Sequence, residues 1–154
     1  MKRKLMLMIA ISSLLLLFTA NGVLASPPLA FHMEIYGIIG QPTGALFTAS
    51  GPAVDYGVIC ETGYEDNLSV TWNNTSGPYR TIWAHKRFYC DDLSGTFDIK
   101  MVVKLDTTTN YTTARWRIVG GTGAYVNLKG QGSLVGIPTT PGYDITDIYD
   151  GKLH

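Results

Sequence analysis

Thr96-Phe97-Asp98-Ile99-Lys100-Met101-Val102-Val103-Lys104-Leu105 is the stretch that decides the fold class of this chain. Its odd-numbered positions are all apolar, and its even-numbered positions are polar or charged apart from Val102. This alternation predicts a β-strand with one face in a hydrophobic core and the other face in water. A strand of that kind is typical of an antiparallel sheet.

A second alternating stretch, residues 112–119, follows after a polar turn at 106–110. Ala114, Trp116 and Ile118 share one face, and Arg115 and Arg117 share the other. Two alternating strands joined by a short turn predict an antiparallel hairpin.

Strand signals continue on both sides of this hairpin, whereas helix signals are nearly absent. The other candidates are residues 31–39, 45–48, 57–60, 68–72, 82–90, 130–136 and 143–153. The sequence predicts a polar loop at residues 63–67 and a turn or half-turn of helix at residues 124–128. Short connections between about eight strands predict an all-β domain, built as an antiparallel barrel or sandwich. We favour a single closed barrel because closure hides the sheet edges.

The N-terminus has the three parts of a secretory signal peptide. A basic start, Lys2-Arg3-Lys4, precedes an apolar run at 5–18 and the small-residue site Val23-Leu24-Ala25. The run is shorter than the roughly 20 residues of a spanning helix, although an uncleaved anchor is the alternative. The prediction is a signal peptide at 1–25, a short leader at 26–30 and a barrel domain at 31–154, secreted or periplasmic.

Cleavage would leave 129 residues with 9 basic and 12 acidic side chains. A mildly acidic domain without a Lys/Arg run is a poor candidate for binding nucleic acid or an anionic membrane. No motif for a cofactor or a metal is found: Asp144, Asp147 and Asp150 recur every third residue, but no glycine and glutamate complete a calcium loop.

Cys60 and Cys90 are the two cysteines of the chain. In an exported protein an even pair is more often bridged than free, so we predict a Cys60–Cys90 disulfide. Two buried free thiols are the alternative.

One face of the strand at 82–90 carries Trp83, His85, Arg87 and Tyr89. Two aromatic rings with an imidazole and a guanidinium could stack on a sugar or aromatic ligand and bond to it. The alternative is an ordinary solvent face whose long side chains cover the sheet.

Glycosylation acceptor sequons begin at Asn67, Asn73, Asn74 and Asn110.

Gly120-Gly121-Thr122-Gly123 does not form a dinucleotide site, because no long helix separates it from Gly130. Glycines at a strand corner instead permit positive φ and close backbone approach.

The segment from Trp116 through this loop to Gly132, with Gly95-Thr96-Phe97 upstream, resembles small barrels related to allene oxide cyclase and dirigent proteins. The resemblance covers about residues 90–136. It implies a closed barrel of roughly eight antiparallel strands with an apolar lumen, and it transfers no catalytic residue onto this sequence.

We therefore expect a secreted barrel that acts without catalysis, by binding a small apolar or aromatic ligand in its lumen or a partner on its surface. One alternative is a cyclase- or dirigent-like enzyme that shapes a reactive intermediate in the lumen. Another is a structural extracellular protein. The filling and polarity of the lumen distinguish these readings.

Overall fold

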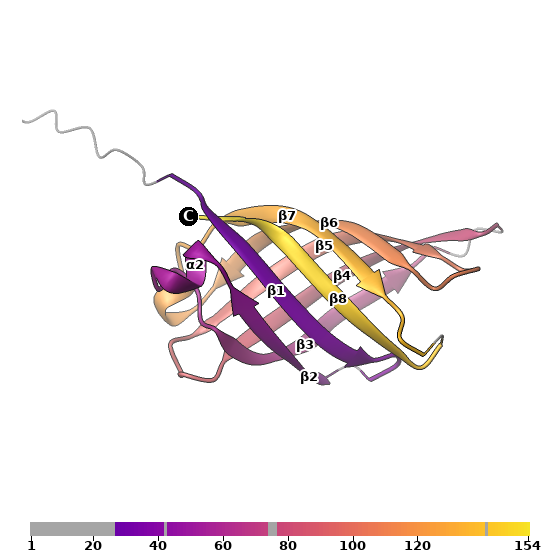
Figure 1. The fold of residues 1–154 in the computed structure, drawn as a ribbon, viewed down its shortest axis with the longest axis horizontal. Coiled ribbons are helices and arrows are strands. Elements are labelled where there is room, and N and C mark those ends of the chain that lie inside the picture. Colours follow the sequence, from indigo (N-terminus) through magenta and orange to yellow (C-terminus); the bar gives the residue numbers. More distant parts are fainter. Residues whose placement is uncertain (1–26, 42, 74–76, 141) are drawn as a thin grey trace, which may run out of the picture.

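The computed structural model describes residues 27–41, 43–73, 77–140 and 142–154. Eight strands form a closed barrel in which each strand pairs antiparallel with the next and β8 returns to β1 (Figure 1). The strands are β1 (Leu29–Ile38), β2 (Thr43–Ser50), β3 (Thr62–Trp72), β4 (Tyr79–Cys90), β5 (Thr96–Asp106), β6 (Thr112–Gly121), β7 (Gly130–Ile137) and β8 (Asp144–Leu153). The predicted fold class and strand number are confirmed.

The predicted signal peptide, residues 1–25, lies outside the described residues. β1 begins at Leu29, two residues before the predicted start of the domain, because Leu29 already pairs with Leu153 of β8. Among the described residues, no helix is long and apolar enough to cross a membrane.

Two predicted elements are wrong. Residues 57–60 do not form a strand: they follow a single helical turn, α2 (Pro52–Asp55), which Pro52 opens because a proline ring fits the first turn of a helix. Residues 63–67 are not a loop but the first half of β3, which is held between β2 and β4. Pairing on both sides overrides the weak strand propensity of these polar residues.

One end of the barrel is capped by two short helical segments. α2 packs against β1 and β2 with Ala53 and Ile59 buried, and the 3-10 turn η1 (Gly123–Tyr125) packs against β5 and β6 (Figure 1). Gly123 has a φ of 59°, and a Cβ there would collide with the Ser94 carbonyl oxygen. The predicted role of the glycine loop, positive φ with close backbone approach, is confirmed at Gly123.

Aromatic side chains fill the barrel from the capped end to its middle. Phe88 stacks on Phe97 with ring centroids 4.7 Å apart, and Trp116 donates from Nε1 to the Ser133 carbonyl oxygen at 2.8 Å. The buried aromatic residues are Phe31, Phe47, Phe88, Phe97, Trp116, Tyr125 and Tyr149. The interior of this half is therefore a packed core and not a channel.

A disulfide joins Cys60 and Cys90, with their Cα atoms 5.9 Å apart. The predicted bridge is confirmed, and neither cysteine is free. It ties the connection after α2 to the last residue of β4, so it fastens the capped end to the wall of the barrel.

Candidate ligand-binding site

Three charged side chains lie inside the barrel, beyond the aromatic core. They are Glu65 on β3, Lys86 on β4 and Asp147 on β8. The alternation of each strand turns them inward. Lys86, for example, is in register with Ile99 of β5, which is fully buried.

These three side chains form one ion-pair cluster. Lys86 Nζ donates to Glu65 Oε1 at 2.6 Å and lies 3.7 Å from Asp147 Oδ2. Glu65 Oε2 is buried and has no hydrogen-bond partner among the described residues. Burying a charge without a partner costs free energy. The positive charge of Lys86 therefore offsets part of the cost of burying the two interior carboxylates.

Burial raises the pKa of the Glu65 carboxyl, and the opposing attraction of Lys86 does not cancel that effect. Burial raises the pKa of Asp147 in the same way. For Lys86, burial acts to lower the pKa, but the two carboxylates outweigh it and the net pKa is raised. Lys86 is therefore a charged ammonium group, held by its neighbours against the low dielectric of the interior.

Beyond this cluster the barrel interior opens into a recess of about 160 Å³. Its floor includes Lys86 and Asp147, and its walls come from β3 to β8. The apolar side chains that line it are Val70, Trp72, Ile82, Ala84, Met101, Val103, Leu134 and Ile145. A concave apolar space that ends on a few polar groups is the usual form of a small-molecule site.

Of the four residues predicted to form an outer binding face, the structure brings Trp83 and His85 to one cleft and places Arg87 and Tyr89 outside it. Trp83 and His85 line a cleft on the outside of the barrel. Arg87 is instead bound to Asp98 through two hydrogen bonds of 2.7 and 2.9 Å, and Tyr89 stacks on Tyr64 with ring centroids 4.7 Å apart.

The sequon asparagines lie in different surroundings. Asn67 is half-buried in β3 and lines the interior recess, and Asn73 accepts a hydrogen bond from the Thr81 amide at 2.8 Å. Asn110 lies in the turn between β5 and β6 with a φ of 61°. Asn74 lies outside the described residues.

Sequence reasoning missed all three members of the interior cluster. A signal for Lys86 was present, because the alternation of β4 puts it on the same face as Ala84 and Phe88. Glu65 was hidden by the expectation of a loop at 63–67.

In the sequence, Asp147 stands out only as part of the three-residue repeat with Asp144 and Asp150. In β8 the three aspartates have different partners. Asp144 accepts a hydrogen bond from the Tyr36 hydroxyl, and Asp150 contacts His32. Of the three, only Asp147 lines the recess. No group of three or more side chains able to hold a metal ion occurs in the part of the chain that the structure describes.

No protein-family model matches the chain, and no curated protein matches it either. The resemblance of residues 90–136 to the allene oxide cyclase and dirigent barrels thus stays a prediction.

Proposed function

We propose that the mature protein is a secreted, non-catalytic binding protein that holds one small apolar or monocyclic aromatic molecule in the recess at the open end of its barrel. The observation that carries this proposal is an apolar recess of about 160 Å³ whose floor is formed by Lys86 and Asp147. The disulfide and the signal-like N-terminal sequence support export.

The size of the recess limits its ligand to about one ring. An engineered apolar cavity of about 150 Å³ holds a benzene molecule, whereas pockets for drug-sized ligands have about 300–1,000 Å³. The aromatic core fills the rest of the lumen, so a longer ligand would have to project from the open end.

The floor of the recess selects for a hydrogen-bond donor on the ligand. Lys86 makes its short contact with Glu65, and its distance of 3.7 Å to Asp147 leaves the Asp147 carboxylate able to accept another hydrogen bond. A phenol or an alcohol meets both requirements, because its ring or chain fits the walls and its hydroxyl can donate to Asp147.

The raised pKa of Lys86 argues against this side chain as a catalytic nucleophile or base. A lysine that acts as nucleophile or base needs a lowered pKa, whereas the pKa of Lys86 is raised. The second candidate function is a cyclase- or dirigent-like enzyme, and the raised pKa of Asp147 beside the recess is the observation that favours it.

Binding of phenol and benzene, followed by NMR chemical-shift titration, tests the proposal. Phenol is expected to shift the resonances of recess residues. Val103→Phe, which fills the recess, should weaken phenol binding at least tenfold. The matched variant Val102→Phe, one residue away on the exposed outer face of β5, should stay within twofold of the wild type.

Asp147→Asn tests the polar floor. Asparagine keeps a carbonyl acceptor but loses the charge, and a hydrogen bond to a charged group contributes about 1 kcal/mol more than one to a neutral group, so the preference for phenol over benzene should fall about fivefold. Equal effects of the two valine variants, or no shifts with either probe, would contradict the proposal. Chemical conversion of a bound phenol, abolished by Asp147→Asn, would favour the enzyme instead.

A further inference from the structure

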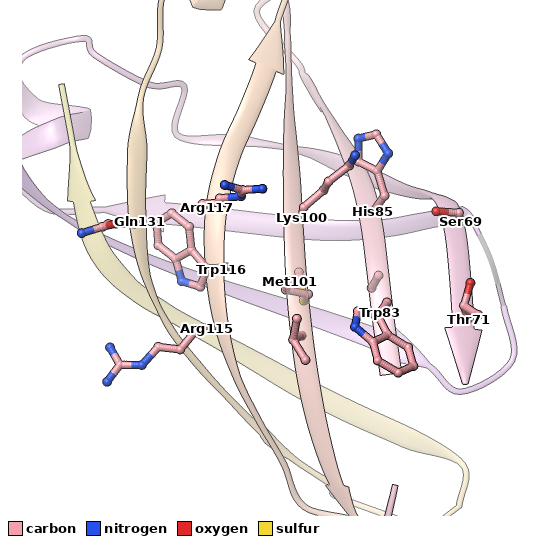
Figure 2. A pocket seen from close by; sticks show the side chains of 12 residues that line it. Ser69, Thr71, Trp83, His85, Lys100, Met101, Arg115, Trp116, Arg117 and Gln131 are labelled. Atoms are coloured by element: carbon pink, nitrogen blue, oxygen red, sulfur yellow. The ribbon is translucent and has the colours of Figure 1, made fainter. Parts of the chain in front are cut away.

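A shallow cleft of about 630 Å³ lies on the outside of β3 to β7 (Figure 2). Its lining comes from five neighbouring strands and includes outward side chains together with the inward-facing Ala84, Met101 and Trp116. The ones that matter here are Trp83, His85, Lys100, Arg115, Arg117 and Gln131.

Strand register arranges the cleft in rows. In one row Ser69 is the partner of His85, His85 of Lys100, Lys100 of Arg117, and Arg117 of Gln131. Figure 2 shows Arg117, Lys100, His85 and Ser69 following one another across neighbouring strands. At about 4.8 Å between strands, this row extends over roughly 19 Å of the surface.

The positive side chains of the cleft lack acidic partners. Lys100 and Arg117 are directly opposite each other, an arrangement that destabilises a sheet because the like charges repel. In the described part of the chain, no carboxylate oxygen lies within 4 Å of Lys100, Arg115 or Arg117. Cationic side chains that repel one another on a mildly acidic domain form a surface complementary to an anion.

The acidic group in contact with His85, Asp98, is already paired with Arg87. Asp98 Oδ2 lies 3.5 Å from His85 Nε2, but both oxygens of Asp98 accept from Arg87. His85 Nε2 has no hydrogen-bond partner among the described residues. Because His85 Nε2 is itself buried beside Asp98, the groups that can bind a ligand in the cleft are Lys100, Arg115 and Arg117.

The second row adds an aromatic platform. Trp83 is in register with Thr71 on one side and Val102 on the other, and its side chain is 46% exposed. An indole face of this kind stacks on flat, weakly polar ring faces, and the neighbouring hydroxyl and amide groups of Ser69, Thr71 and Gln131 suit a partner rich in hydroxyls.

We propose that this cleft binds an acidic polysaccharide, with its carboxylates on Lys100, Arg115 and Arg117 and one sugar ring on Trp83. Arginine and carboxylate pair through two parallel hydrogen bonds, which gives such a contact both strength and orientation. The length of the row suits a chain of several sugar units.

Other anionic macromolecules fit the cleft less well. A peptide commonly docks by adding a strand to a free sheet edge, and β3 to β7 are paired along this face in a closed barrel. A single-stranded nucleic acid needs successive aromatic platforms, whereas Trp83 is the only aromatic side chain exposed among those lining the cleft.

Affinity electrophoresis through gels containing polygalacturonate, with dextran as the neutral control, tests this proposal. Polygalacturonate should retard the wild-type protein and dextran should not, and the retardation should weaken with added salt. Lys100→Ala should weaken binding at least fivefold. Lys104→Ala, which removes the same charge from the same face of β5 outside the cleft, should stay within twofold.

Trp83→Ala separates sugar stacking from charge alone and should weaken binding at least threefold without changing the salt dependence. The proposal would be overturned by equal losses in the two lysine variants, by no retardation in polygalacturonate, or by tighter binding to oligo-dT than to polygalacturonate. Because Lys100, Lys104 and Trp83 are exposed, thermal melting can verify that each variant keeps its fold.

Discussion

Lys86→Met is expected to destabilise the barrel by about 3–5 kcal/mol, because it leaves buried carboxylates without their cation. Lys86 is the partner of both Glu65 and Asp147, and Glu65 Oε2 already has no hydrogen-bond partner among the described residues. Urea unfolding at pH 7 measures the loss. Lys100→Met on the outer face of β5 is the matched control and should change the free energy of unfolding by less than about 0.5 kcal/mol.

The pH dependence of this variant distinguishes a lost charge pair from lost packing. The pKa of Glu65 is raised in the folded protein, and removing Lys86 raises it further, so the folded state binds more protons than the unfolded state above pH 4.5. Stability of the variant should therefore fall as the pH rises from 4.5 through the raised pKa. A loss of the same size at pH 4 and pH 8 would show that Lys86 contributes by packing instead.

Cys60→Ala combined with Cys90→Ala is expected to cost about 3–4 kcal/mol, since the disulfide closes a loop with a sequence separation of 30 residues. For a domain of this size the melting temperature should fall by roughly 10–15 °C. The Ala53 and Ile59 side chains of the capped end should become accessible first, because the bridge fastens their segment to β4.

Reductant is the control for the disulfide. Dithiothreitol should lower the melting temperature of the wild type toward that of the double variant and leave the double variant unchanged. Labelling of the native wild type by a thiol reagent before reduction would contradict the bridge.

The barrel was predictable because its strongest signals are local. The alternation of β5 assigns Phe97, Ile99, Met101 and Val103 to the core, and all four are buried. Short connections then leave consecutive antiparallel pairing as the simplest arrangement, which the structure confirms from β1 to β8.

The candidate sites were predictable only in part, because they depend on side-chain contacts between residues that are far apart in the sequence. Alternation along β4 correctly places Trp83 and His85 on the outer face of the barrel. It cannot show that Arg87, on the same face, is paired with Asp98 of β5. Nothing local marks Glu65 as the partner of Lys86, since the two lie 21 residues apart and meet only when β3 pairs with β4. Asp147 joins them only when β8 closes the barrel.

The pairing of β1 with β8 has a consequence for how the chain reaches its folded state. These strands share ten register pairs, from Leu29–Leu153 to Ile38–Asp144. Because β1 is the first strand and β8 the last, their pairing cannot form until nearly the whole domain has been synthesised. Closing so distant a seam is slow compared with forming a hairpin. During synthesis, β1 therefore presents an open hydrogen-bonding edge until the last strand arrives, and self-association through that edge competes with completion of the barrel.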